Sequence, residues 1–249
     1  MMNINNTVNS LWISPIIGEL QLLCIQSFLD KGIAFHLYTY NNLQNVPVGV
    51  VVKDANTIIA EDKIFLDLKN SFATFSDWFR IKLLHEVGGW WVDCDTFCIK
   101  RFNFDAPYVF ATEGISQHGA RHLCICNAVI KLPAKSKFGE EVLKEIQQKF
   151  ASKKHEEITW TEIGAQILYK QIAIQKLLEY VKPTVFFCPN DYTNFEQLSQ
   201  FDNLTFDENT YAVHLWNKMW EWNNIEPLED ATENSFLGKA RTRYQKNNL

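Results

Sequence analysis

The stretch from Ser71 to Phe97, SFATFSDWFRIKLLHEVGGWWVDCDTF, constrains the fold most strongly. Its apolar side chains recur at helical spacing and predict a helix over 71–87, with one face formed by Phe72, Phe75, Phe79, Leu83 and Val87. Gly88 is typical of the left-handed residue that ends a helix. Residues 90–92 predict a short buried strand, and the acidic triplet 93–95 follows it directly. The pattern therefore predicts that the carboxylates of Asp93 and Asp95 lie close together at the end of this strand.

The rest of the chain alternates between strand and helix patterns. The opening order of strand, helix and strand is typical of a parallel sheet with right-handed crossovers. Strands are expected at 11–13, 34–40, 48–52, 90–92, 108–112, 122–130, 185–188 and 211–216. Helices are expected at 19–30, 71–87, 136–151 and 161–180, with a short helix and loop at 56–67. We predict a single α/β domain over 1–249, with a Rossmann-like mixed central sheet flanked by helices and a small C-terminal appendage.

Composition limits the classes of function. The chain has 249 residues, of which 47% are hydrophobic, and can bury a sizeable core. Its net charge of -5 gives no electrostatic case for binding nucleic acid. No apolar run approaches the roughly 20 residues of a membrane span. The start, MMNINNTVNS, lacks the basic and apolar regions of a signal peptide, so a cytoplasmic protein is expected.

The six cysteines, at positions 24, 94, 98, 124, 126 and 188, form no C-x-x-C pair. In a cytoplasmic protein they are expected to be reduced thiols. A zinc site built from Cys94, Cys98, Cys124 and Cys126 is an alternative, although its spacings are unusual. Alternate positions on one strand explain Cys124 and Cys126 more simply.

The D-x-D sequence at Asp93 and Asp95 suggests a divalent metal. In an extended segment, residues two apart point the same way, and oxygen ligands suit Mg²⁺ or Mn²⁺. A solvated loop would also explain this pattern. Asp77 and Arg80 share a face of the preceding helix, and an arginine beside a metal-bound diphosphate forms charge-assisted hydrogen bonds. The alternative for that pair is an ordinary ion pair on the helix surface.

The run SDWFRIKLLHEVGGWWVDCDTF resembles the S-D-x-x-R…L…G-G-x-Y-x-D-x-D block of DXD-motif glycosyltransferases. It is most similar to the glycosyltransferase family 32 type, whose sugar-binding region is shared with capsular polysaccharide enzymes and large glucosylating toxins. Weaker similarities lie in SLWIS, CICNAVI and YAVHLWNKMW. The chain departs from the family pattern at Trp91 in place of Tyr, at Ser14-Pro15 in place of a glycine-rich turn, and at 162–165 in place of Gly-Pro.

The resemblance implies a GT-A-like fold, with nucleotide-sugar binding in about 1–100 and the acceptor part in about 101–249. It also implies roles for individual residues. Asp95 is a direct metal ligand, Asp93 bridges the ribose and the metal, and His214 is a further ligand. Donor-binding residues are Trp12 on the nucleobase, Asp77 and Arg80 on the sugar, and Trp220 on the leaving diphosphate, while Asn127 faces the acceptor. The imidazole favours Mn²⁺ over Mg²⁺.

The resulting hypothesis is a retaining transferase that moves a hexosyl unit from a nucleotide sugar, expected to be a UDP-sugar, to a hydroxyl of a glycan. Cell-surface polysaccharide or lipopolysaccharide synthesis is the expected setting. A non-catalytic sugar-nucleotide-binding module, a transferase acting on a protein and a metal-dependent phosphohydrolase or nuclease are the alternatives. The basic C-terminal tail suggests peripheral contact with the inner face of a membrane, or simply a solvated terminal helix.

Overall fold

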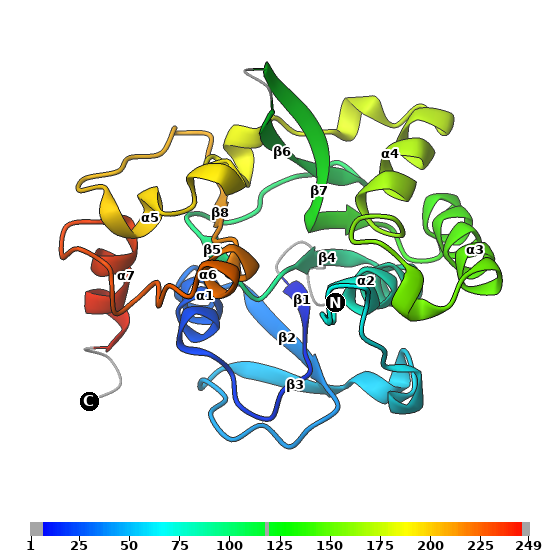
Figure 1. Ribbon diagram of the computed structural model, residues 1–249, viewed down its shortest axis with the longest axis horizontal. Coiled ribbons are helices and arrows are strands. Elements are labelled where there is room, and N and C mark those ends of the chain that lie inside the picture. Colours follow the sequence, from blue (N-terminus) through cyan, green and yellow to red (C-terminus); the bar gives the residue numbers. More distant parts are fainter. Residues whose placement is uncertain (1–6, 118–119, 246–249) are drawn as a thin grey trace.

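The computed structural model describes residues 7–117 and 120–245, which form an α/β fold around a six-stranded sheet (Figure 1). The strand order is β3-β2-β1-β4-β7-β6. The strands are β1 (Thr7–Trp12), β2 (Ala34–Thr39), β3 (Val50–Asp54), β4 (Gly89–Val92), β6 (Val109–Gln117) and β7 (Ala120–Leu132). Strands β1 to β4 run parallel to one another, whereas β7 is antiparallel to β4 and β6. The predicted mixed sheet is therefore confirmed.

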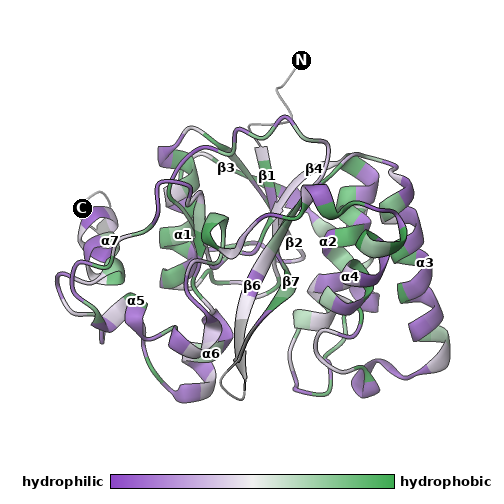
Figure 2. Cartoon of the chain, turned by 90° about the horizontal axis from the view of Figure 1, so that it is seen from above, coloured by the Kyte–Doolittle hydropathy of each residue, from purple (hydrophilic) through white to green (hydrophobic). Residues whose placement is uncertain are grey.

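Helices cover both faces of this sheet, as Figure 2 shows. On one side lie α1 (Glu19–Asp30) and α7 (Phe236–Gln245), and on the other α2 (Ala73–Val87), α3 (Lys137–Ser152) and α4 (Ala165–Ile174). Each side has its own hydrophobic core. Because side chains alternate along a strand, Trp90 of β4 packs into the first core and Trp91 into the second. No helix in the described ranges is long and apolar enough to cross a bilayer.

A second, two-stranded sheet stands after β4. It pairs β5 (Thr96–Cys98) with β8 (Ala212–His214) in antiparallel register, so that His214 lies opposite Thr96. The chain then enters α6 (Asn217–Asn223). This pairing places β8 and the following residues of the C-terminal part of the chain beside the residues that directly follow β4.

Several short helices connect these elements. They are α5 (Gln197–Gln200) and 3-10 helices at Ala55–Thr57, Glu61–Lys63, His155–Glu157, Leu178–Tyr180, Thr184–Phe186 and Tyr192–Asn194. The expected strand at 185–188 is therefore wrong: the N–H of Cys188 bonds locally to the carbonyl of Thr184, and the ladder of a strand is absent there. The expected helix at 161–180 is shorter, because Thr161 and Lys176 have left-handed backbones with φ of 76° and 58°.

Two other expectations need correction. Strands β6 and β7 are longer than the strands expected at 108–112 and 122–130, so most of the segment between those two ranges is strand; residues 118–119 lie outside the described residues. Gly88 does end α2, but with φ 68° and ψ -172° it is not in the left-handed helical region. That backbone conformation is essentially restricted to glycine. A Cβ on Gly88 would also lie 2.5 Å from the backbone nitrogen of Ala134.

We predict that Gly88→Ala destabilises the protein more than Gly49→Ala does. Both glycines have positive φ, so each alanine introduces backbone strain of about 1–3 kcal/mol. A Cβ on Gly49 meets nothing closer than 3.6 Å, whereas a Cβ on Gly88 also collides with backbone, which adds about 1 kcal/mol or more. Urea unfolding measures both. Equal losses for the two variants would contradict this account of the α2–β4 junction.

Candidate active site at the carboxyl end of β4

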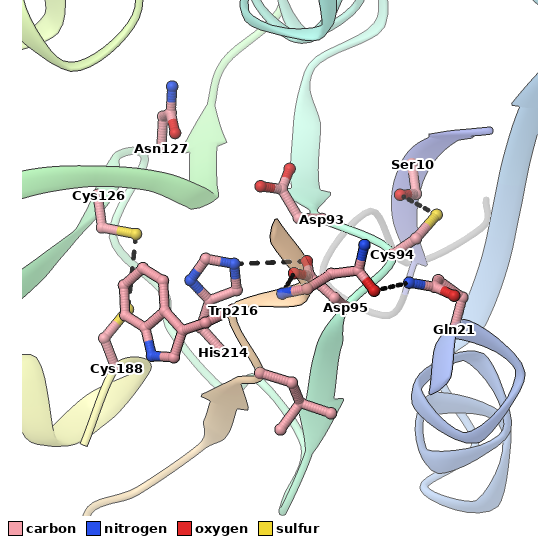
Figure 3. Close-up of polar contacts among 12 residues, drawn as sticks. Ser10, Gln21, Asp93, Cys94, Asp95, Cys126, Asn127, Cys188, His214 and Trp216 are labelled. Carbon is pink, nitrogen blue, oxygen red and sulfur yellow. Dashed lines mark hydrogen bonds and ion pairs between the residues drawn. The ribbon is translucent and has the colours of Figure 1, made fainter. Parts of the chain in front are cut away.

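The two aspartates of the D-x-D sequence lie on a tight turn. The N–H of Thr96 donates to the carbonyl of Asp93 at 3.0 Å, so the expectation of an extended segment is wrong. The middle residue, Cys94, is buried, and its Sγ lies 3.0 Å from the Oγ of Ser10 on β1. With Cys94 anchored in the core, the turn presents both carboxylates on the opposite side (Figure 3).

Asp95 is held by the segment that enters with β8. Because of the β5–β8 register, the Nε2 of His214 lies 3.4 Å from the Oδ1 of Asp95. The N–H of Asn217, in the first turn of α6, donates to Asp95 Oδ2 at 2.8 Å, and the N–H of Leu215 donates to its carbonyl at 2.9 Å. The side chain and the backbone of Asp95 are thus both fixed by residues more than a hundred positions away.

The electrostatics of this pair favour an ion pair. Burial acts to raise the pKa of Asp95, but the charge and hydrogen bond of His214, together with the Asn217 N–H, outweigh it and lower that pKa. Burial likewise acts to lower the pKa of His214, and the charge of Asp95 raises it well above its usual value. Cations are therefore favoured beside this carboxylate.

Asp93, Asp95 and His214 form a set of groups that fits a divalent metal. Each offers one ligand atom, and these atoms all lie within 4.8 Å of one another. The exposed fractions of the Asp93 and Asp95 side chains are 23% and 14%, so both reach the surface of the site. Two carboxylate oxygens and one imidazole nitrogen suit Mn²⁺ and Mg²⁺, with the nitrogen favouring Mn²⁺.

Arg80 connects the D-x-D turn to helix α2. One guanidinium nitrogen lies 3.0 Å from Asp93 Oδ1, and another lies 3.2 Å from Asp77 Oδ1. The Arg80 side chain is 4% exposed and also donates to the Ser76 side chain. The alternative of a surface ion pair is therefore wrong. Asp93 Oδ1 is further fixed by the indole N–H of Trp91, which donates to it at 2.7 Å.

A bulge in β7 places Asn127 beside Arg80 and Asp77. Phe110 pairs with Ile130 but the next residue, Ala111, pairs with Cys126, so the residues between them on β7 bulge away from β6. The carbonyl of Asn127 accepts from Arg80, and its Nδ2 donates to Asp77 Oδ1 at 2.7 Å. The structure thus places Asn127 against the carboxyl of Asp77.

The carboxyl of Asp77 is buried among Arg80, Asn127 and Gly164. A Cβ on Gly164, just before α4, would lie 2.2 Å from Asp77 Oδ2, so only glycine allows this close approach. Burial is the main cause that raises the pKa of Asp77 to about 7, and the nearby Asp93 adds to it, while Arg80 and the Asn127 hydrogen bond oppose it. Arg80 shares one positive charge between the carboxylates of Asp77 and Asp93. Its effect on the pKa of Asp77 is therefore smaller than the effect of burial.

Two of the expected donor-binding residues do not lie against the aspartates. Trp220 is 1% exposed, packs edge-on against Phe195, and donates its indole N–H to the Leu215 carbonyl at 2.6 Å. The structure places its ring in the hydrophobic core, and the expected contact with a diphosphate stays a prediction. Trp12 is half-buried at the carboxyl end of β1, and its indole N–H donates to the carbonyl of Ile16.

Sequence reasoning missed Trp216 and a separate contact between a lysine and two tryptophans. The ring of Trp216 lies 4.1 Å from that of His214, centroid to centroid, and could have been found because it occupies the same H-x-W motif. Lys69 lies over the rings of Trp160 and Trp222, at 4.4 and 4.3 Å. These three come from separate loops and helices, and no spacing in the sequence signals their contact.

We predict that Asp77→Asn removes a pH-dependent loss of stability. The folded pKa of about 7 lies above the value of 3.8 for an ordinary Asp, so the folded state binds more protons in between. The stability that this group contributes is present below the lower value and is lost as the pH rises through the higher one. Between about pH 5 and pH 8, the wild type should therefore lose about 2 kcal/mol relative to the variant.

Urea unfolding across this pH range measures the difference. Asp62→Asn, at an exposed carboxylate, is the control for the loss of one acidic residue. Parallel stability curves for the wild type and Asp77→Asn would contradict the raised pKa.

The chain is similar to one protein family in sequence and to several solved structures in fold. Residues 56–158 match the sequence model of the capsular polysaccharide synthesis proteins. No curated protein matches the chain. Among solved structures, a glycosyltransferase called PaToxG has 15% identity over 70% of this chain and 73% of its own, with a TM-score of 0.49. The apo form of glycosyltransferase GlyE of Streptococcus pneumoniae TIGR4 has 12% identity and a TM-score of 0.47, over 98% of this chain and 64% of its own.

The family match falls on the part of the chain that carries the cluster. It contains helix α2 with Asp77 and Arg80, the turn with both aspartates, and Asn127. Trp12 and His214 lie outside the matched residues. Over residues 56–158, the expected resemblance to capsular polysaccharide enzymes is thus confirmed.

Proposed function

We propose that this chain is a metal-dependent retaining glycosyltransferase. It moves a hexosyl unit from a nucleotide sugar, for which a UDP-sugar is the expected donor, to a hydroxyl of a glycan. The observation that carries this proposal is the convergence of Asp93, Asp95 and His214 beside an arginine that a helix holds in place. Carboxylates for a cation and a guanidinium for phosphate are the groups that a donor diphosphate requires.

The bound metal, Mn²⁺ or Mg²⁺, would supply Lewis-acid stabilisation of the departing diphosphate. Asp95 is proposed as its direct ligand and His214 as a further one, with Asp93 between the metal and the donor ribose. Arg80 adds a fixed positive charge 3.0 Å from Asp93, and because it is pre-oriented, it needs no reorganisation as negative charge develops. Asp77 is proposed to hold hydroxyl groups of the donor sugar, oriented by Asn127.

A front-face path accounts for retention. A double displacement needs a carboxylate that is free to attack the anomeric carbon. The carboxyl of Asp77 is engaged by Arg80 and Asn127 and closed off by Gly164, which suits a positioning group better than a nucleophile. We therefore propose that an oxygen of the departing phosphate takes the proton from the acceptor hydroxyl on the same face of the sugar.

The acceptor is proposed to be a glycan, or a lipid-linked glycan, of the cell surface, and the matched family supports this setting. Contact of the tail with a membrane at the cytoplasmic face remains a prediction, and the structure adds little to it. Arg243 pairs with Asp30 at 3.1 Å, and Lys239 donates to the Asn203 side chain. Helix α7 also buries Leu237, so it is part of the folded core and not a free basic segment.

A binding module and a transferase acting on a protein are the two alternative functions, and the release of nucleoside diphosphate distinguishes them from the proposed one. A non-catalytic binding module would be stabilised by nucleotide sugars without releasing nucleoside diphosphate, and a transferase acting on a protein would release it only with a protein acceptor. A screen of nucleotide sugars with Mn²⁺, read by thermal shift and by nucleoside diphosphate release, separates these outcomes. Nucleotide release that ignores the sugar would instead favour a phosphohydrolase.

We predict that Asp93→Asn and Asp95→Asn each lower metal-dependent turnover by at least about 100-fold. Both substitutions keep the shape of the side chain but remove a negative charge from the cation site. Release of nucleoside diphosphate at saturating Mn²⁺ measures the effect. Asp105→Asn, at an exposed residue of the loop after β5, is the matched control and should keep wild-type turnover.

Circular dichroism and thermal unfolding establish that the variants remain folded. Wild-type turnover in both folded variants would overturn the assignment of the D-x-D turn as the metal site.

A further inference from the structure

Behind the ring of His214 lies a second group of metal-binding side chains. Cys126 of β7 and Cys188, which follows the 3-10 helix Thr184–Phe186, approach His214 from separate parts of the chain. One ligand atom from each lies within 4.8 Å of the others, and the two sulfurs are 3.5 Å apart. The exposed fractions of Cys126 and Cys188 are 3% and 0%. Figure 3 shows the two thiols on the side of the imidazole opposite to Asp95.

The imidazole offers this group a nitrogen that is otherwise unused. Its Nε2 faces Asp95, whereas Nδ1 is buried and has no hydrogen-bond partner in the described part of the chain. His214 as a whole is 9% exposed. Buried polar atoms without a partner are rare in folded proteins, and each calls for an explanation such as an ion or a water. The side chains closest to this nitrogen that could share a bound ion with it are the thiols of Cys126 and Cys188.

The distance between the sulfurs fits a shared metal ion. Two Zn–S bonds of about 2.3 Å in a tetrahedral site place the sulfurs about 3.8 Å apart, close to the 3.5 Å in the structure. A disulfide would need about 2.05 Å and hence a movement of both side chains. Thiolate and imidazole ligands select zinc-like cations, and carboxylate ligands select Mg²⁺ or Mn²⁺.

We propose that Cys126, Cys188 and the Nδ1 atom of His214 form a binding site for a thiophilic cation such as Zn²⁺, separate from the site on the D-x-D turn. Binding forms two metal–sulfur bonds and one metal–nitrogen bond, and the two thiol protons pass to the buffer. The site stands whether or not the proposed transferase activity does.

This site would also set the role of His214. A metal-bound histidine ordinarily donates its other ring N–H to a carboxylate, which fixes the orientation of the ring. With zinc on Nδ1, the Nε2–H of His214 donates to Asp95, which lies 3.4 Å away. In the zinc-loaded protein, His214 would hold Asp95 through its Nε2 atom, and its proposed role as a further ligand of the donor metal would apply only to the zinc-free protein.

Cobalt provides the most direct test, because thiolate ligands give Co²⁺ a charge-transfer absorption that carboxylate ligands do not. Chelator-treated, reduced protein is titrated with Co²⁺ and then with Zn²⁺. We expect the absorption to saturate at about one Co²⁺ per chain and to disappear when Zn²⁺ replaces it. Zinc content of the protein as purified, measured by mass spectrometry, should be about one per chain.

Variants locate the site and separate it from the donor metal. Cys126→Ser and Cys188→Ser should each lose the absorption, whereas Cys124→Ser, on the same strand, and Asp93→Asn, on the D-x-D turn, should keep it. Circular dichroism checks that the variants fold. Absence of the absorption in the wild type, its persistence in both serine variants, or a disulfide between Cys126 and Cys188 in the freshly purified protein would each overturn the proposal.

Discussion

One buried arginine between two carboxylates ties the site together. Arg80 links Asp77 on its own helix to Asp93 after β4, and it donates to the Asn127 carbonyl in the β7 bulge. Removal of one member of such a buried ion pair typically costs about 3–5 kcal/mol, because the partner is left charged and unpaired. Above the Asp77 pKa of about 7, the two carboxylates and one cation carry an excess of negative charge. That excess favours binding of a divalent cation, which would also weaken the pairing of Arg80 with Asp93.

The sequence predicted the elements whose signals are local. The pattern in 19–30 predicted α1 with its exact bounds, and the S-D-x-x-R spacing correctly placed Asp77 and Arg80 on one helix face, because both follow from the geometry of a single helix. The D-x-D pair was expected on an extended segment and lies on a turn. The buried side chain of Cys94 decided that conformation, and it depends on a contact with β1 that no local pattern shows.

What could not be predicted depends on long-range contacts. Asn127 reaches Asp77 through a bulge, and the bulge lies where β7, which already pairs with β6, also begins to pair with β4. Cys126 was considered with other cysteines of its own region, yet its neighbour is Cys188, from a segment that was expected to be a strand. The motif around Trp220 suggested a ligand contact, and its ring packs in the hydrophobic core. Composition and periodicity do not distinguish these outcomes.

The central claim is that the turn at Asp93 and Asp95 holds a divalent metal for a nucleoside diphosphate. Crystals grown with Mn²⁺ and a nucleoside diphosphate, measured by anomalous scattering at the manganese absorption edge, test it most directly. The account predicts a manganese peak about 2 Å from a carboxylate oxygen of Asp95, beside the diphosphate and the Arg80 guanidinium. A nucleotide bound elsewhere, or a manganese ion away from both aspartates, would contradict it.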